Sequence, residues 1–263
     1  LVRNGQGRVA DYERARVMLK EWLLAYPMRN GRWVDGHSDT WIDGNTNLST
    51  TCASDMCLYL FDNPGWDPAF KADAEALIRW TEDNFVLQPT PDSLPGQFHG
   101  AYVPAEQTAY NYRMGYQAAR LGAQYAQWYK VSGDEKYRDR AYRCLVYNTY
   151  MMQENGQSSD GPTDEVGWWW SDCYGEAPRM YYYGLAAVPE WAPPDENHLL
   201  HSSSIVTTVI YSNRKIEYST LDSSATELFR LCQKPESIKA GGIVLNRLDS
   251  LTQSGWTFDS TAG

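Results

Sequence analysis

The sequence has few basic residues and no long apolar run. It contains 23 Lys and Arg against 33 Asp and Glu, which gives a formal net charge of −10. A nucleic-acid partner requires a basic stripe that neutralises phosphates, so this charge balance argues against such a partner. No apolar run approaches the roughly 20 residues that a membrane span requires, and we predict no membrane partner. An initiating Met and a signal peptide are also lacking, so we expect a processed or trimmed form.

Cysteines are few, odd in number and dispersed along the chain. The five are Cys52, Cys57, Cys144, Cys173 and Cys232. Cys52 and Cys57 lie about a turn and a half apart on one predicted helix, which is poor geometry for a disulfide. The chain contains no CxxC motif, His/Cys ligand cluster or EF-hand-like spacing, so we predict no metal site and no cofactor. Buried free thiols are the expected state.

Phenylalanine is scarce among the aromatic residues, since six Phe stand beside 11 Trp and 19 Tyr. Trp and Tyr combine an apolar ring face with a hydrogen-bonding edge. A sugar ring presents complementary surfaces, with C–H groups on its face and hydroxyls around its rim. Several of these residues lie in predicted loops, where packing in a core is less obligatory. The alternative, that Trp and Tyr fill gaps between helices, stays open for any single residue.

Apolar residues at helical spacing predict six helices, separated alternately by long and short connections. The predicted helices span about residues 9–26, 49–62, 67–85, 106–130, 134–153 and 175–188. Ser49, Asp67 and Asp134 are the predicted N-caps. The long loops span residues 27–48, 87–104 and 154–174. If consecutive helices run antiparallel, every long loop lies at one end of the bundle, and we predict that this end carries the function.

The residues that follow Pro193-Pro194 have a different character. Short runs rich in Ile, Val, Thr and Tyr alternate with turn residues such as Asn213-Arg214 and Gly241-Gly242, which predicts antiparallel strands. The predicted strands span residues 201–211, 215–220, 226–231, 237–240 and 243–245. We therefore predict a mainly α chain with two domains, helical residues 1–192 and a small antiparallel β module of residues 193–263.

Carboxylates and tryptophans share the first and third long loops. The candidates are Asp39, Trp41, Asp164, Glu165, Trp168, Trp169, Trp170 and Asp172, and Glu176 opens the next helix. Hydrolysis of a glycosidic bond needs a carboxylic acid that protonates the leaving oxygen and a carboxylate that activates water or attacks directly. We predict Asp164 or Glu165 as the general acid and Asp39 or Asp172 as the base. The four Trp are predicted to stack on sugar rings, and Glu176 to bind substrate.

Two alternatives are open for these residues. Any one carboxylate can instead be a helix cap or a turn residue. A lyase acting on uronic acids would need a Tyr or His base and a group that neutralises the sugar carboxylate. The second long loop and the helix after it offer His99 and Tyr102 for the first role and Asn111 for the second.

Three stretches resemble the α/α toroid of carbohydrate-active enzymes, which is known from six-hairpin glycosidases and toroid polysaccharide lyases. They are residues 106–117, 129–137 and 168–179. The first two look like a helical hairpin unit common to many toroids. The resemblance implies that inner helices begin at the substrate face, as would the helices that follow each long loop here. Their positive N-terminal ends would favour an anionic sugar or a catalytic carboxylate.

Long loops recur every ~60 residues, so the helical region holds three hairpin pairs, about half of a closed toroid. We expect the sequence to be the carboxy-terminal half of a longer enzyme, with a missing N-terminal half or a homo-oligomer partner completing the ring. The leading prediction is that the protein is a glycoside hydrolase that acts on an oligo- or polysaccharide. This substrate can be neutral or acidic. A uronate lyase and a non-catalytic glycan-binding protein are the alternatives. For such a protein we expect a secreted or periplasmic location.

Overall fold

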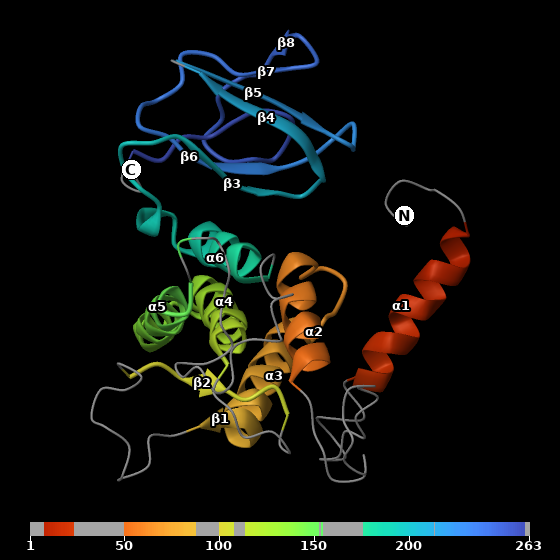
Figure 1. Cartoon of the computed structure of the whole chain (residues 1–263). Helices are drawn as coiled ribbons and strands as arrows, with labels where there is room; N and C mark the ends of the chain where they lie inside the picture. Colours follow the sequence, from red (N-terminus) through yellow and green to blue (C-terminus); the bar gives the residue numbers. More distant parts are fainter. Residues whose placement is uncertain are drawn as a thin grey trace. The chain divides into compact units, whose positions relative to one another are not determined.

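The computed structural model divides into two compact units, residues 1–187 and residues 188–263, here called the helical unit and the β unit (Figure 1). It describes residues 8–23, 50–87, 100–107, 114–152, 154, 176–212 and 214–260. The predicted division after residue 192 falls just beyond this boundary. The described chain is rich in helix and ends in small antiparallel sheets, which confirms the predicted order of helices followed by a β module.

Six α-helices lie in the described part of the helical unit. They are α1 (Val9–Leu23), α2 (Thr51–Asp62), α3 (Phe70–Phe85), α4 (Gly115–Ser132), α5 (Glu135–Thr149) and α6 (Glu176–Ala187). None of the described helices is both long and apolar enough to cross a bilayer.

Helices α2, α4 and α6 run parallel to one another. Arg120 of α4 pairs with Glu176 at the start of α6. About two turns further along both helices, Gln127 donates to the backbone oxygen of Tyr183. Tyr183, near the end of α6, also donates to Asp62 at the end of α2. Because contacts join start to start and end to end, the three helices begin at the same end of the unit.

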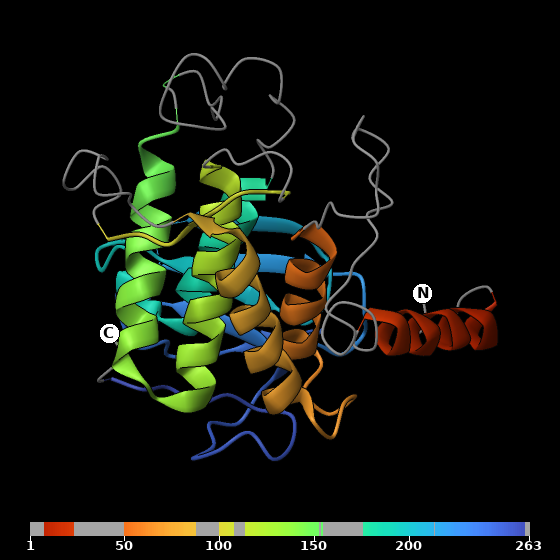
Figure 2. The same cartoon turned by 90° about the horizontal axis from the view of Figure 1, so that it is seen from below.

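Helix α5 runs in the opposite direction to α4. A Cβ atom added to Gly122 would lie 3.0 Å from Cys144 Cβ and 3.2 Å from the backbone oxygen of Ala141, so these two helices approach closely. Gly133 reverses the chain between them with a φ of 73°, and Asp134 caps α5 by accepting from Lys136 N, as the sequence predicts. Figure 2 shows α2 to α5 side by side.

This arrangement gives the helical unit two different ends. We call the end where α2, α4 and α6 begin the loop end, because residues 24–49, 88–113 and 155–175 precede those helices there. The other end, where residues 63–69 and 133–134 reverse the chain, is the turn end. The parallel direction of the three helices is the arrangement that the alternation of long and short connections predicts.

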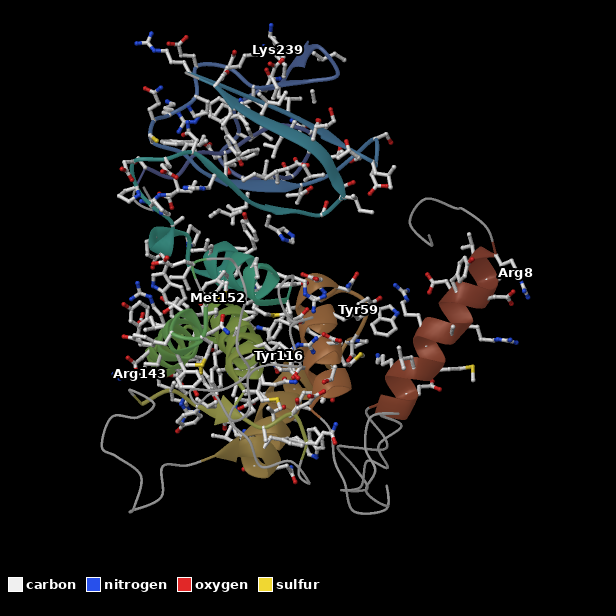
Figure 3. The ribbon with its side chains drawn as sticks, in the orientation of Figure 1. Arg8, Tyr59, Tyr116, Arg143, Met152 and Lys239 are labelled. Carbon is white, nitrogen blue, oxygen red and sulfur yellow. The ribbon has the colours of Figure 1, made fainter. Side chains whose placement is uncertain are left out.

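The core of the helical unit surrounds α4. Fully buried apolar side chains from α2, α3, α4 and α6 meet there: Leu60, Leu77, Ile78, Leu121, Tyr125 and Met180. Helix α1 contributes less to this core. It contacts the α2–α3 turn through Lys20, which pairs with the buried Asp67 at 2.9 Å, and through Arg16, which donates to Tyr59 of α2 (Figure 3).

A two-stranded pairing replaces part of the second predicted loop. Strand β1 (Val86–Leu87) pairs antiparallel with β2 (Val103–Pro104). The prediction that a helix begins at Glu106 is wrong, because α4 begins at Gly115. The backbone of residues 105 and 106 makes hydrogen bonds to distant residues instead: Ala105 N donates to Phe85 O, and Glu106 O accepts from Thr50 N. These long-range bonds hold residues 105 and 106 outside a helix.

Two helix starts also differ from prediction. Helix α2 has Thr50 as its N-cap rather than Ser49, and the Thr50 hydroxyl donates to Gln117 of α4 instead of capping its own helix. Helix α3 begins at Phe70, three residues after the predicted cap. The Asp67 carboxylate accepts from Ala69 N, so it stabilises the turn that leads into α3.

The β unit consists of short strand pairs after a 3-10 helix, η3 (Pro189–Trp191). Its strands are β3 (His198–Ser202), β4 (Val206–Ser212), β5 (Lys215–Thr220), β6 (Glu227–Arg230), β7 (Lys239–Ala240) and β8 (Ile243–Val244). Strand β3 pairs with β6, β4 with β5 and β7 with β8, all antiparallel. The turn predicted at 241–242 is confirmed, since Gly241 and Gly242 have positive φ, and Arg214 of the other predicted turn also has positive φ.

The single strand predicted over residues 201–211 is two strands in the structure. The chain leaves β3 after Ser202, and Ser203 N then donates to Thr226 O next to β6. Strand β4 starts at Val206 and pairs with β5 instead. Because β3 and β4 have different partners, the chain must bend between them, which a run of β-forming residues does not reveal.

Candidate functional site at the loop end

Four charged side chains form an ion-pair cluster at the loop end, which we call the loop-end cluster: Asp55, Arg120, Glu176 and Arg179. Arg120 is 8% exposed. Its Nη1 lies 3.2 Å from Asp55 Oδ1, and its Nε lies 2.7 Å from Glu176 Oε1. The Nε contact is ionic without hydrogen-bond alignment, since the N–H finds no acceptor in good geometry. One buried guanidinium thus holds carboxylates from α2 and α6.

Arg179 binds the same two carboxylates from the surface side. Its Nη2 lies 2.9 Å from Glu176 Oε1 and 3.3 Å from Asp55 Oδ1. A single nitrogen atom therefore bridges an oxygen of each carboxylate. Arg179 and Asp55 are each about half exposed, so this face of the cluster is open to solvent.

Buried polar side chains surround the cluster. Thr50 Oγ1 donates to Gln117 Oε1 at 3.0 Å, and Arg120 Nη1 also reaches the backbone oxygen of Thr51. The buried polar residues contributed by α2, α4, α5 and the segments before α2 and α4 are Thr50, Ser54, Glu106, Gln107, Gln117, Arg120, Gln124 and Asn148. Buried polar groups are costly unless they are hydrogen-bonded, and the bonds of Thr50, Gln117 and Arg120 lower this cost.

The helix ends add a positive potential to the loop end. The N-terminus of an α-helix carries about half an elementary positive charge, and here three parallel helices begin together. The two carboxylates and two guanidiniums of the loop-end cluster cancel in formal charge. The remaining positive potential of the helix ends favours a negatively charged or hydroxylated group among the long segments that precede these helices.

Glu176 is the predicted site residue that the structure places in this cluster. It is the first residue of α6, its side chain is 20% exposed, and both arginines contact it. Its position at a helix start fits the alternative role of a structural carboxylate as well as substrate binding.

Most predicted site residues lie outside the described part of the chain. They are Asp39, Trp41, His99, Asn111, Asp164, Glu165, Trp168, Trp169, Trp170 and Asp172. Their roles stay predictions. All of them belong to the segments that connect to α2, α4 or α6, or to β2, at the loop end.

Tyr102, the candidate base of a lyase, lies in a separate polar cluster next to β2. Its hydroxyl accepts from Arg140 Nη2 at 2.9 Å, and the guanidinium carbon of Arg140 lies 4.3 Å from its ring centroid. Arg140 Nη1 also donates to Glu82 at 2.7 Å, and Glu82 accepts from Tyr125 at 2.6 Å. The Tyr102 hydroxyl thus takes part in a network that ties α3, α4 and α5 together.

The ionisation of this network favours its present hydrogen bonds. Burial, the nearby Cys144 and the Glu82 carboxylate raise the pKa of Tyr125. The Tyr125 phenol therefore stays protonated and donates to Glu82, which also receives a charged hydrogen bond from Arg140. The network stabilises the packing of the helices, and it is not joined to the loop-end cluster by any bond between described residues that we find.

Sequence reasoning did not identify Arg120 or Arg179 as members of a site. Arg179 lies three residues after Glu176, a spacing that places both side chains on one helix face. Arg120 stands among Ala119, Leu121 and Gly122, and a charged residue in such an apolar stretch of a long helix indicates a buried partner. These two patterns are the features of the sequence that point to Arg179 and Arg120.

Metal ligands are not gathered in the described residues, where no group of three or more His, Cys, Asp or Glu side chains could hold an ion. The described cysteines Cys57, Cys144 and Cys232 are free; the first two are buried, as predicted, and Cys232 is exposed. The sequence matches no protein-family model, and a comparison with curated proteins also finds no match.

Proposed function

We propose that the helical unit is a glycoside hydrolase of toroid-like helical hairpins, which cleaves glycosidic bonds in an oligo- or polysaccharide at the loop end. The observation that carries this proposal is the convergence of α2, α4 and α6. Their first two turns bring two carboxylates and two arginines together, next to buried polar groups. The segments that enter these helices carry the Trp and carboxylate residues named from the sequence.

The loop-end cluster has a positioning role in this proposal. Arg120 fixes Glu176 and Asp55 from within the core, so neither carboxylate moves freely. A fixed carboxylate accepts hydrogen bonds from sugar hydroxyls without losing side-chain entropy at the moment of binding. Glu176 and Asp55 would therefore hold a sugar ring next to the reacting bond.

The bond-breaking residues would come from the loops. Asp164 or Glu165 would protonate the leaving oxygen, and Asp39 or Asp172 would activate water or attack the anomeric carbon. Asp172 stands four residues before Glu176 in the sequence, which favours it among the candidates of the third long loop. Trp41, Trp168, Trp169 and Trp170 would stack on sugar rings and exclude water from the acid, which favours its protonated form.

A uronate lyase is the second candidate because the loop end is favourable for an anion. Three helix N-termini and the half-exposed Arg179 suit a sugar carboxylate. In that reaction His99 or Tyr102 would remove a proton, and Asn111 with Arg179 would neutralise the substrate carboxylate.

A polysaccharide screen tests the proposal. Acidic and neutral polysaccharides are incubated with the full chain, and each is read both for new reducing ends and for ultraviolet absorbance from a conjugated double bond. Reducing ends without absorbance are expected. Reducing ends with absorbance would replace the hydrolase by the lyase. Binding without either product would leave a glycan-binding protein and overturn the catalytic proposal.

A further inference from the structure

The β unit contains a hollow lined by Glu196, Asn197, His198 and Tyr211. Three of these residues are consecutive and lead into β3, whereas Tyr211 lies near the end of β4. The hollow measures about 330 Å³, the lower end of the range for small-molecule sites, and it suits one ring-sized ligand. All four residues belong to the β unit, whereas the loop-end cluster belongs to the helical unit.

Tyr211 gives the hollow an aromatic wall of fixed orientation. Its hydroxyl accepts a hydrogen bond of 2.9 Å from Leu199 N in β3, although β3 and β4 do not pair with each other. The bond ties the ring to the start of β3. The side chain is nevertheless 46% exposed, so part of it remains available to a ligand. An exposed aromatic ring held in place is a suitable surface for stacking.

The polar groups around the ring include both donors and acceptors. Asn197 Oδ1 accepts from Cys232 N at 2.9 Å, which orients the amide and leaves its NH₂ group to donate to a ligand. Tyr211 accepts from Leu199 and keeps its O–H as a donor. Glu196 is an acceptor, and its Oε2 lies 3.3 Å from His198 Nε2.

We propose that this hollow binds a single sugar ring. A hydroxyl both donates and accepts, so a ring of hydroxyls satisfies the Asn197 and Tyr211 donors and the Glu196 acceptor together, while its C–H face covers the Tyr211 ring. A cation would leave both donors without acceptors, and an anion would lie against Glu196. The site goes beyond the function proposed for the helical unit, because it is a separate binding site that needs no catalysis.

Backbone amides provide a local test of this site. The full chain is labelled with ¹⁵N and titrated with methyl β-D-glucopyranoside, methyl α-D-mannopyranoside and sodium glucuronate. The amides of Leu199 and Cys232 report on the hollow, because each donates to one of its lining side chains. We expect at least one of these sugars to shift both resonances in the millimolar range. Shifts confined to α2, α4 and α6 would instead report only the site of the proposed hydrolase.

Three variants separate stacking from hydrogen bonding. Tyr211→Ala is expected to weaken binding about tenfold, and Tyr211→Phe, which keeps the ring, by about threefold. Asn197→Asp keeps the acceptor for Cys232 N and removes the donor, so it tests the site even if Tyr211→Ala unfolds the β unit. Tyr142→Ala, at an exposed Tyr of α5, is the control and should bind as the unchanged protein does.

Three results would overturn the proposal. One is the absence of any shift at Leu199 and Cys232 with all three sugars. Another is unchanged affinity in both Tyr211→Ala and Asn197→Asp. The third is a response of these amides to tetramethylammonium but not to the sugars, which would identify a cation site.

Discussion

Helix α4 and strand β4 differ most clearly in burial. Thirteen of the 18 residues of α4 are buried, whereas none of the seven residues of β4 is. Helix α4 contacts α2, α3, α5 and α6, and β4 has β5 as its hydrogen-bonded neighbour. The helical unit can therefore hold a charged group such as Arg120 inside its core, while the β unit presents side chains such as Tyr211 at its surface.

The two kinds of surroundings suit two kinds of site. A buried arginine that fixes two carboxylates provides a rigid polar floor, which catalysis requires. A half-exposed tyrosine on a two-stranded sheet, held by the bond from Leu199 N, provides a binding surface that is open to solvent. The difference predicts that substitutions in α4 affect stability strongly and that matched substitutions in β4 do not.

The largest effect is expected for Arg120→Met. Among the described residues, removing the guanidinium leaves Arg179 as the ion-pair partner of Asp55 and Glu176. Breaking a fully buried ion pair by deleting one partner costs about 3–5 kcal/mol, and we expect about 3 kcal/mol here because Asp55 is half exposed and both carboxylates keep Arg179. Urea unfolding, followed by near-ultraviolet circular dichroism, measures the free energy of unfolding.

Arg79→Met is the control for this substitution. Arg79 pairs with Glu75 within α3 and is 65% exposed, so a loss below about 0.5 kcal/mol is expected. Equal losses for the two variants would contradict the burial of the loop-end cluster.

The next effect concerns the contact between α4 and α5. In Gly122→Ala, the new Cβ would lie 3.2 Å from the Ala141 backbone oxygen, which cannot rotate away. Overpacking of this kind costs about 1–3 kcal/mol. Gly65→Ala is the matched control, because a Cβ there meets nothing within 4 Å. Comparable thermal midpoints for the two variants would show that α4 and α5 are less closely packed than described.

Alkaline pH should destabilise the helical unit through its buried thiols. Burial raises the pKa of Cys57 and raises that of Cys144 to about 12, from an ordinary thiol value of 9.0. The folded state therefore keeps protons that the unfolded state releases. The stabilisation is complete below about pH 8.5 and declines as pH rises towards 12, by about 1.4 kcal/mol per pH unit for each thiol.

Urea midpoints at pH 8 and pH 10 measure this decline. Cys144→Ala should make it smaller by about 1 kcal/mol or slightly more. Cys232→Ala, at the exposed thiol of the β unit, should leave the decline as it is. A decline that is the same in all three proteins would contradict the assigned burial of Cys144.

The smallest effect is expected in β4. Ile210 is 59% exposed, so Ile210→Thr removes little buried apolar surface and keeps the β-branched shape that a strand favours. Its free energy of unfolding should differ from that of the unchanged protein by about 0.5 kcal/mol or less. A loss above 2 kcal/mol would show that this face of β4 is covered, and it would remove the contrast with α4.

The sequence reveals the local features of this fold better than the long-range ones. The cap at Asp134, the glycine turn at Gly133 and the direction of α2, α4 and α6 follow from spacing and loop length. The start of α4 could not be predicted, because Ala105 and Glu106 bond to Phe85 and Thr50, which are distant in sequence. Local propensity does not contain such partners.

The candidate site was predictable only in part. The loop end follows from the alternation of loop lengths, and Glu176 was identified because it opens a helix after a loop rich in carboxylates. The pairing of Arg120 with Asp55 and Glu176 joins residues 65 and 56 positions apart, which no single-sequence pattern specifies. Which carboxylate of a loop carries the chemistry also depends on long-range placement.

We propose glycosidic cleavage at the loop end and not at the turn end, and substitutions at the two ends test this directly. Carboxylates at the two ends are replaced by their amides, and initial rates of reducing-end formation are compared on the best polysaccharide of the screen. The variants that we call loop-end variants alter the loop-end cluster or the long segments that precede α2 and α6 in the sequence: Asp39→Asn, Asp55→Asn, Asp164→Asn, Glu165→Gln, Asp172→Asn and Glu176→Gln. The turn-end controls are Asp62→Asn and Glu135→Gln.

We expect at least one loop-end variant to lose about 100-fold or more in rate, while both controls stay within about twofold of the unchanged protein. Full activity in all six loop-end variants, or inactivation by a turn-end substitution in a protein that still folds, would contradict the proposal.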